Sequence, residues 1–287
     1  MEIFELRYFV EVARHENIHR ASERLKVSPA SLSKAIARIE GELGAKLFVR
    51  DGRNIRLSDQ GKLLKLRATQ ILAMEESARM EISGHRGQIQ VVMAGPEVLL
   101  SKMGLELSDQ ISKRNPGASF EYHACDDDRA LREVGSGDAH LAIVSSEETP
   151  GLVSKVIGET DFVTVVGPGH PLYASAKRGR TVPVEEVLEH SFVSPSRPIL
   201  GRVGLKQSMD GWRDDRFTRK VAFLTSSLKL LEELVRRGRG LAYLPEYYAE
   251  RLGVLTLKVS GCPYSCKQKI RLVARRPQDH GWLKGLF

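Results

Sequence analysis

The sequence predicts an α/β protein in three parts: a small helical N-terminal domain, a long linker helix, and a larger α/β region. Three observations support this division. Apolar residues recur with helical spacing before residue 44, good helix formers without proline follow Gly61, and strand-like and helix-like segments alternate from Gln88 onward. We therefore expect domains at 1–58, 59–87 and 88–287.

Composition favours a cytoplasmic protein with no membrane partner. The 287 residues are 41% hydrophobic and 28% charged, and no apolar run approaches the roughly 18–20 residues needed to span a bilayer. Acidic residues near the N-terminus argue against a signal peptide, and three cysteines fit reduced thiols better than a disulfide framework. Residues 20–65 hold eleven Lys and Arg against five acidic residues, as expected of a phosphate-binding module.

The N-terminal domain contains three predicted helices. Asn17 is placed to cap the second, Ser28 to cap the third, and Pro29 to be the third helix's first residue. Its apolar positions recur at steps of four, three and four, which predicts one buried face. That face consists of Leu32, Ile36, Ile39 and Leu43. A short helix, a tight turn and a second helix with a polar start are typical of a helix-turn-helix.

The outer face of the third helix is made of small or flexible polar residues. Such residues allow the backbone to enter a major groove closely, and hydroxyl and basic groups bond base edges or phosphates. A solvated helix with an ordinary serine cap would share these features, so the following segment is needed to decide. We expect the DNA-binding residues to be Ser28, Ala30, Ser31, Ser33, Lys34, Arg38, Arg50 and Arg53.

A two-stranded hairpin is predicted directly after this helix. Gly44 ends the helix, and Asp51-Gly52 is a strong hairpin turn signal. Arg50, Arg53 and Arg56 surround the turn. A wing bearing arginines beside a helix-turn-helix lies against the DNA backbone or in the minor groove.

The ordered features of this segment include Tyr8-Phe9, the "ELG..LF.R" block from Glu42 to Arg50, Leu57-Ser58 and Gly61. With them the segment resembles the winged helix-turn-helix of LysR-type transcriptional regulators over about 60 residues. Pro29 and Ala30 depart from the usual family residues, which leaves the preferred DNA sequence unread.

Residues 59–83 predict a linker helix, and "SGHRGQ" at 83–88 predicts a hinge. Leu64, Ala68, Ile71, Ala78 and Ile82 form a narrow apolar seam interrupted by Glu75. Such a seam suggests pairing with a second copy, and packing within its own domain is the alternative. The resemblance implies a dimer through this helix, and a tetramer is a further option.

Alternating elements in 88–287 predict a parallel sheet with helices on its faces. Asn115-Pro116, "G.GDAHLAIV", "GHPL" at 169–172 and "LVRRGRGLAYLPE" make this region resemble the family's effector-binding domain, which has two α/β lobes of periplasmic-binding-protein type. We place lobe I at about 88–163 and 267–287, and lobe II at about 164–266.

A ligand in such a fold binds between the lobes, at strand carboxyl ends and helix N-termini. Glu97 and the acidic run at 126–128 would oppose an anion there, so the charge of the effector stays open. The expected effector-binding residues are Ser101, Asp126, Ser194, Ser196, Arg197, Thr225 and Ser226.

The sequence contains no catalytic motif, and we expect neither an enzyme nor a bound cofactor. Cys262 and Cys266 lack the neighbouring ligands of a metal site, and a redox pair is less favoured than ordinary packing. The predicted protein is a LysR-type regulator with double-stranded DNA, a small-molecule effector, a second copy and RNA polymerase as partners. Its alternatives are a solute-binding protein without DNA function, or a DNA-acting enzyme with a helix-turn-helix tether.

Overall fold

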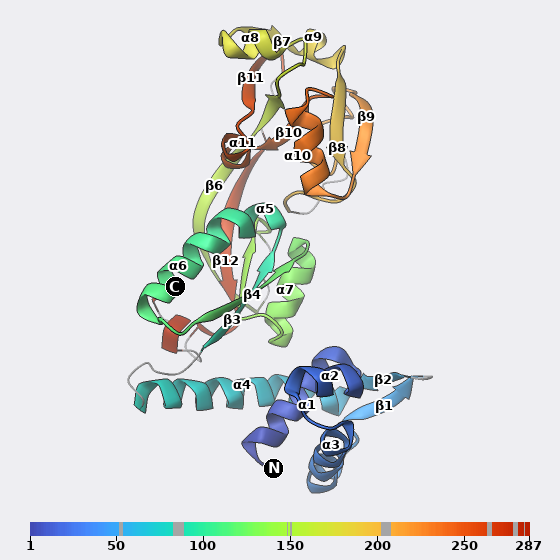
Figure 1. Cartoon of the computed structure of the whole chain (residues 1–287), viewed down its shortest axis with the longest axis vertical. Coiled ribbons are helices and arrows are strands. Elements are labelled where there is room, and N and C mark those ends of the chain that lie inside the picture. Colours follow the sequence, from blue (N-terminus) through green and yellow to red (C-terminus); the bar gives the residue numbers. More distant parts are fainter. Residues whose placement is uncertain are drawn as a thin grey trace.

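The computed structural model describes residues 1–51, 54–82, 89–147, 149, 151–201, 208–262, 266–277, 281–283 and 285–287. Its parts follow one another along the long axis of the molecule (Figure 1). The N-terminal domain and helix α4 lie at one end, lobe I of the C-terminal region lies next to them, and lobe II forms the other end. The chain passes between the lobes twice, through β6 (Val153–Val166) and β12 (Lys267–Ala274).

The N-terminal domain has three helices and a two-stranded antiparallel sheet, as predicted. These are α1 (Ile3–His15), α2 (Ile18–Leu25), α3 (Pro29–Leu43), β1 (Phe48–Asp51) and β2 (Asn54–Leu57). One apolar cluster joins α1, α3 and the following segment around Phe9, Ile39 and Leu47. A second joins α1, α2 and α3 around Ala21 and Leu32. Of the predicted hairpin turn Asp51-Gly52, Asp51 is the last residue of β1 and pairs with Asn54, whereas Gly52 and Arg53 lie outside the described residues.

The buried face of α3 matches the prediction at three of its four positions. Leu32, Ile36 and Ile39 are buried, whereas Leu43 is 47% exposed, so its predicted burial is wrong. Leu43 is the last residue of α3, and Gly44 then turns the chain with a φ of +64°. Neither apolar cluster of the domain extends to this last helical turn.

Helix α4 (Asp59–Ile82) confirms the predicted linker helix, and the predicted hinge at 83–88 lies outside the described residues. The first half of its apolar seam packs inside its own domain, where Ala68 is buried and Leu64 lies against the α1 cluster. Farther along, Ile71 is exposed, and Glu75 forms ion pairs with Arg7 of α1 and with Arg79. The seam predicted for pairing with a second copy is therefore partly used within the chain.

Lobe I contains a parallel group of three strands with helices beside it. Its elements before the first crossover are β3 (Gln90–Gly95), α5 (Glu97–Leu99), the short π-helix η1 (Leu100–Gly104), α6 (Leu105–Arg114), β4 (Ser119–Ala124), α7 (Asp127–Ser136) and β5 (Leu141–Val144). The short helix η3 (Gly281–Leu283) follows β12 near the C-terminus. Residues 91–94 and 141–144 are all buried because helices and loops cover both faces of the sheet.

Lobe II begins within β6 and is built from shorter elements. These are α8 (Tyr173–Lys177), β7 (Thr181–Pro183), α9 (Val184–Leu188), β8 (Ser191–Pro195), β9 (Lys220–Thr225), α10 (Leu228–Arg236), β10 (Ala242–Pro245), α11 (Glu246–Leu252) and β11 (Leu255–Ser260). Strands β8 and β9 form a separate parallel pair on which α10 packs.

The main sheet is mixed, which corrects the predicted parallel sheet. Its order is β4-β3-β5-β12-β6-β11-β7, with β10 also paired to β6. Strand β3 runs parallel to β4 and β5, as expected, but β12 is antiparallel to β5 and β6. The chain leaves lobe I through β6 and returns through β12, so these two strands run in opposite directions. Alternation of elements along a sequence does not reveal a strand shared by two lobes.

The described part of the chain has no helix long and apolar enough to cross a membrane. Within the same residues, His, Cys, Asp and Glu side chains form no group of three or more that could hold a metal ion. Cys262 and Cys266 line a common cavity, which is described below.

Gly61→Ala will destabilise the N-terminal domain. A Cβ at this position would lie 2.1 Å from the carbonyl oxygen of Leu47, so the start of α4 and the segment before β1 would have to separate. Overpacking of this kind costs about 1–3 kcal/mol, which a thermal melt followed by circular dichroism would record as a lower Tm. Gly41→Ala is the matched control, because no atom lies within 4 Å of its Cβ and alanine favours the helix. Equal melting of Gly61→Ala and the wild type would contradict the close contact.

Candidate nucleic-acid interface and ligand cleft

The turn between α2 and α3 is defined by residues that end one helix and begin the next. Asn17 caps α2 by accepting a hydrogen bond from the Arg20 N–H at 3.0 Å. Lys26 ends α2 with a φ of +54°, a left-handed conformation that reverses the chain. Ser28 caps α3 by accepting from the Ser31 N–H at 3.1 Å, and Pro29 is its first residue. Both predicted caps are confirmed.

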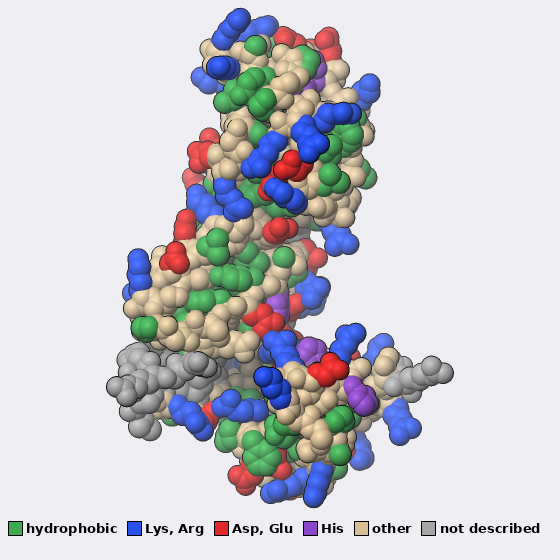
Figure 2. All heavy atoms as spheres, viewed as in Figure 1, with side chains coloured by type: hydrophobic (Ala, Val, Ile, Leu, Met, Phe, Trp, Pro, Cys, Tyr) green, Lys and Arg blue, Asp and Glu red, His purple; other side chains and the backbone are tan. Residues whose placement is uncertain are grey.

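Six of the predicted DNA-binding residues lie on α3 or its cap, and all six are exposed. They are Ser28, Ala30, Ser31, Ser33, Lys34 and Arg38. Figure 2 shows Lys and Arg side chains spread over this end of the molecule. Lys34 makes no ion pair with any described residue, whereas Arg38 lies 3.3 Å from the carboxylates of both Glu5 and Glu42. Since Glu5 is buried, Arg38 also has a structural role, which spacing alone did not indicate.

The wing is anchored to the helices by hydrogen bonds to carboxylates. Glu40 at the end of α3 accepts from the Leu47 N–H at 2.8 Å, and Glu16 after α1 accepts from the Leu57 N–H at 2.9 Å. Arg50 is exposed on β1 opposite Ile55, and Arg56 is exposed on β2. The wing therefore carries exposed basic residues on a hairpin fixed relative to α3.

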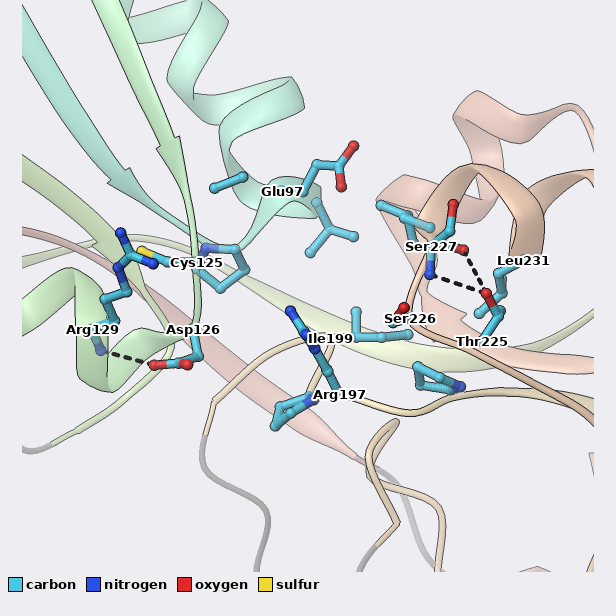
Figure 3. A pocket seen from close by; sticks show the side chains of 16 residues that line it. Glu97, Cys125, Asp126, Arg129, Arg197, Ile199, Thr225, Ser226, Ser227 and Leu231 are labelled. Carbon is cyan, nitrogen blue, oxygen red and sulfur yellow. Dashed lines mark hydrogen bonds between the residues drawn. The ribbon is translucent and has the colours of Figure 1, made fainter. Parts of the chain in front are cut away.

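A cleft of about 280 Å³ lies between the two lobes (Figure 3). The carboxyl ends of β3, β4, β8 and β9 lead into it, as do the N-termini of α7 and α10. Lobe I contributes residues 96–98, 124–126 and Arg129, and lobe II contributes residues 195, 197–199, 225–228 and 231. This is the position expected for a ligand in an open α/β fold.

The cleft contains two basic and two acidic side chains among apolar residues. Glu97, Asp126 and Arg129 come from lobe I, and Arg197 comes from lobe II. Figure 3 shows Arg197 reaching between the two sides, with Thr225 and Ser226 beside α10. Burial, followed by the nearby Glu133 carboxylate, raises the pKa of the Cys125 thiol to about 11, so this thiol is neutral at pH 7. The cleft thus offers charges of both signs, which suits a small polar molecule.

Two family models match the chain over most of its length. One, described as "Bacterial regulatory helix-turn-helix protein, lysR family", covers residues 3–62, and one described as "LysR substrate binding domain" covers residues 85–280. The chain belongs to the LysR family. It is a DNA-binding transcriptional regulator with an effector-binding domain, and its curated relatives are regulators rather than solute-binding proteins or enzymes.

Individual relatives of this LysR-type chain extend over nearly its full length. It is 25% identical to the HTH-type transcriptional regulator IlvY of Escherichia coli over 291 residues, covering 95% of both chains. ArgP from Mycobacterium tuberculosis has a similar fold, with a TM-score of 0.64, 18% identity, and coverage of 95% of this chain and 90% of that one. Full-length LysG from Corynebacterium glutamicum, with bound effector Arg, gives a TM-score of 0.59, 19% identity, and coverage of 96% and 92%.

Four of the seven predicted effector-binding residues line the cleft of this LysR domain: Asp126, Arg197, Thr225 and Ser226. The other three lie outside the lining. Ser101 bonds its own helix through the Val98 carbonyl, and Ser194 is buried on β8, where side chains alternate in direction so that Pro195 lines the cleft instead. Ser196 is exposed, and its backbone N–H bonds to the Thr225 carbonyl.

Sequence reasoning missed Arg129 and Ser227, although both had a local signal. Ser227 is the N-cap of α10, and its hydroxyl accepts from the Leu230 N–H. Arg129 lies three residues after Asp126, the N-cap of α7, so it shares the first helical turn with a residue predicted to face the ligand. A basic residue at that spacing is placed beside the cap by helical geometry alone.

Asp127 holds the start of α7, which borders the cleft, in place. One of its carboxylate oxygens accepts hydrogen bonds from the Ser145 and Ser146 N–H groups at 2.9 and 2.8 Å, and from the Ser145 hydroxyl. These bonds tie the start of α7 to the end of β5. Burial nevertheless dominates, and it raises the pKa of this carboxyl to about 6.

A line of ion pairs connects the cleft with the helix-turn-helix. Arg129 bonds Glu133 at 2.8 Å, and the other oxygen of Glu133 lies 2.6 Å from Nδ1 of His123. Nε2 of His123 lies 3.2 Å from Glu121 on β4, and Glu121 accepts from Arg24 of α2 at 2.8 Å. We call this set of five side chains the charge relay. It joins lobe I to the DNA-binding domain within one chain.

A second contact lies beside the charge relay. Lys65 of α4 bonds Asp138 after α7 at 2.8 Å, and Arg14 of α1 lies 3.8 Å from the same carboxylate. Gly137 lies so close to Thr69 of α4 that a Cβ there would be 2.8 Å from the threonine methyl. The DNA-binding domain and lobe I therefore meet through charged and closely packed groups.

Asp127→Asn will reduce the pH dependence of stability between about pH 4 and 6. Because burial raises the folded-state pKa from 3.8 to about 6, the folded state binds the proton more tightly than the unfolded state. Asp127 therefore contributes most to the free energy of unfolding below its unfolded-state pKa. This contribution, roughly 3 kcal/mol in total, is lost as the pH rises through 6. Urea unfolding from pH 4 to 7 measures the slope. An unchanged slope in Asp127→Asn would contradict the assignment, and exposed Asp109→Asn is the control.

Proposed function

We propose that the start of α3 enters the major groove, with its serines against base edges and Lys34 against a phosphate or a guanine. The observation that carries this proposal is the bare outer face of α3, exposed from Ser28 to Lys34 and free of bulky side chains at its tip. Ser31 and Ser33 keep the backbone close to the groove, and Arg50 and Arg53 of the wing reach the flanking backbone. This assignment gives the serines and Lys34 the base and phosphate contacts of the groove, and gives the wing arginines the flanking backbone.

Self-association supports binding to a site with dyad symmetry. LysR-type regulators form oligomers, and α4 leaves Leu63, Ile71 and Met74 exposed at 57%, 38% and 64%. Apolar residues exposed at this level on one helix favour pairing with the same helix of a second copy. Val221 and Leu224 of β9 and Leu230 of α10 are also exposed apolar residues, and a second interface at this end would extend a dimer to a tetramer.

A cytoplasmic location and a contact with RNA polymerase are both expected of a transcriptional regulator. A regulator must meet chromosomal DNA, which supports the expected cytoplasmic location. RNA polymerase as a partner stays a prediction. The domain limits 1–58, 59–87 and 88–287 also stay predictions, and they agree with a linker helix that begins at Asp59.

Lys34→Ala and Arg53→Ala will each weaken operator binding while leaving the melting temperature unchanged. Each variant removes one positive charge that contacts DNA, so the affinity for the operator falls several-fold. The slope of log K against log salt concentration becomes less steep by about one unit. Lys62→Ala is the control, since Lys62 is an exposed lysine that pairs with Asp59 away from α3. Fluorescence anisotropy with an operator fragment at several salt concentrations measures both quantities. Undiminished affinity in both variants would rule out this docking.

The effector of this proposal is a small carboxylate that also carries an ammonium or another donor. Arg197 is exposed, and the α10 N-terminus next to Ser226 offers N–H groups, so this side of the cleft suits a carboxylate. Glu97 and Asp126 on the opposite lobe suit the donor. A cavity of about 280 Å³ limits the ligand to a small molecule such as an α-amino acid.

Small L-α-amino acids will bind the effector-binding domain more tightly than the matching 2-oxo acids, which lack the ammonium group. Arg197→Ala will weaken amino-acid binding about 10–100-fold, because a hydrogen bond to a charged group is worth about 1.5–3 kcal/mol. Arg178→Ala, an exposed arginine outside the cleft, should bind as the wild type does. Calorimetric titration of both ligand series measures the affinities. Equal affinity for the two series would exclude the acidic side of the cleft from recognition.

The charge relay provides a route from the effector to the DNA-binding domain. Arg129 shares the lobe I wall with Asp126, so a ligand whose donor group binds Asp126 changes the surroundings of Arg129 and thereby its bond to Glu133. Because His123 contacts Glu133 through one ring nitrogen and Glu121 through the other, a change at Glu133 reaches Glu121 and Arg24 through this side chain. Closure of the lobes would then release the helix-turn-helix from lobe I, a hinge-type switch.

Glu121→Gln will raise operator affinity about two- to fivefold, although Glu121 lies outside the DNA-binding domain. The Arg24–Glu121 pair must break before the helix-turn-helix reorients, and a partly exposed ion pair is worth about 0.2–1 kcal/mol. Combining Glu121→Gln with Arg24→Gln should add less than the two single effects, because they remove one shared contact. Glu106→Gln, an exposed glutamate on α6, is the control. Strictly additive effects on anisotropy-measured affinity would contradict the coupling.

A further inference from the structure

A second cavity of about 240 Å³ lies in lobe II and shares no lining residue with the effector cleft. Its walls are largely aromatic. Tyr243 of β10 lies 5.5 Å from Phe162 of β6 and 5.2 Å from Trp212, measured between ring centroids, and Phe217 completes this side. Leu257 of β11 lies on the apolar side, and the two thiols of Cys262 and Cys266 complete the lining.

The aromatic wall is held in place by a buried cation. The side chain of Arg219 has no exposed surface, and it bonds Asp210 at 2.8 Å, Asp214 at 3.0 Å and the Ser208 hydroxyl at 2.9 Å. Its guanidinium also lies 5.1 Å from the Trp212 ring centroid. Because breaking a buried pair is costly, the segment from 208 to 219 keeps Trp212 fixed, and the cavity is formed before any ligand arrives.

Among the described residues that line it, the cavity presents no unpaired charge. Arg213 at its edge forms a two-pronged pair with Asp215, at 2.7 and 2.9 Å. Burial raises the pKa of the Tyr243 hydroxyl and of the Cys266 thiol, so both groups are neutral at pH 7. The remaining polar groups near the space are the hydroxyls of Thr164 and Tyr243. Uncharged hydrogen-bonding groups among aromatic rings select against ions, since an ion would lose its hydration without gaining a partner.

We propose that this second cavity is a binding site for a small uncharged aromatic molecule, of the size of phenol or indole. An apolar cavity of about 150 Å³ already accepts benzene, so the space in lobe II holds one substituted ring. The ring packs against Trp212 and Phe162, and its hydroxyl or N–H bonds the Tyr243 hydroxyl. This proposal does not depend on the nature of the effector in the cleft.

The site lies where the two crossover strands enter lobe II. The Phe162 N–H of β6 donates to the Cys266 carbonyl before β12 at 2.9 Å, and both residues line the cavity. A ring in contact with both residues therefore packs on the connection between the lobes. Binding of the ring in the second cavity would favour the orientation of the lobes in which Phe162 and Cys266 stay in contact. The ligand would thus be a second signal to the regulator, in addition to the effector in the cleft.

The three cysteines of the chain allow the two cavities to be tested separately. Cys125 lines the effector cleft, and Cys262 and Cys266 line the second cavity. Iodoacetamide labelling of the full chain, followed by mass spectrometry, gives the rate at each thiol. When nine-tenths of the sites are occupied, phenol or indole should slow labelling of Cys262 about tenfold without slowing Cys125. Benzoate, an anion of similar size, should not protect Cys262.

Two variants and one control decide the outcome. Leu257→Trp fills the cavity and should abolish protection, and Tyr243→Phe removes a hydrogen bond and should weaken phenol about fivefold. Tyr173→Phe, the same change outside both cavities, should behave as the wild type does. The proposal fails if neither probe protects Cys262 at its solubility limit, if Cys125 is slowed equally, or if benzoate protects as well as phenol. It also fails if phenol binds Tyr243→Phe and the wild type equally.

Discussion

The antiparallel pairing of β6 with β12 is the interaction on which the C-terminal two-thirds of the molecule depends. These two strands pair from Val153 with Ala274 to Asp161 with Lys267, and a register shift at Ile270–Arg271 interrupts the ladder. Lobe I pairs with β12 through β5, and lobe II pairs with β6 through β10 and β11. The chain thus passes between the lobes through this two-stranded connection, and Arg251 of α11 adds a bond from lobe II to the Ser101 carbonyl of lobe I at 2.8 Å. The geometry of the two strands therefore helps to set the width of the cleft. A bulge bends and twists a strand locally, and here it lies between the two lobes.

The fold was predictable wherever local chemistry determines it. Asn17, Ser28 and Pro29 fix two helix starts through their own hydrogen bonds and backbone angles, and both starts lie where the sequence placed them. The exposure of Leu43 was not predictable in this way, because periodicity identifies a helix face but does not say how far the neighbouring helices extend along it. The mixed sheet was missed for a related reason. Strand direction in β12 depends on the return of the chain from a distant lobe, which leaves no local pattern.

The predicted cleft residues show the same limit at the level of side chains. Serines before helices were good candidates, and Thr225 and Ser226 do line the cleft, but Ser101 satisfies its hydroxyl within its own helix. Ser194 fails by strand alternation, which a residue-by-residue motif does not include. Conversely, Arg129 was missed although its spacing from the cap Asp126 was a local signal, and the structure places both residues in the lining of the cleft. Position in the chain identified the loops at the cleft, and the three-dimensional neighbours determined which atoms face the ligand.

The contrast between Arg219 and Arg24 explains how one chain combines a rigid wall with a movable domain. Arg219 is fully buried among carboxylates and rings, so removing its partners would leave an unpaired charge in a low dielectric, and moving the segment that it holds is costly. Arg24 is 42% exposed, water screens its pair with Glu121, and replacing that pair by hydration costs about 1 kcal/mol or less. A ligand shifts an equilibrium only by its differential affinity for two states, which is a few kcal/mol for a small molecule. If the effector is to separate the DNA-binding domain from lobe I, the contacts between them must therefore cost as little to break as those of the charge relay. The walls of a ligand site must instead resist distortion, as the buried Arg219 cluster does.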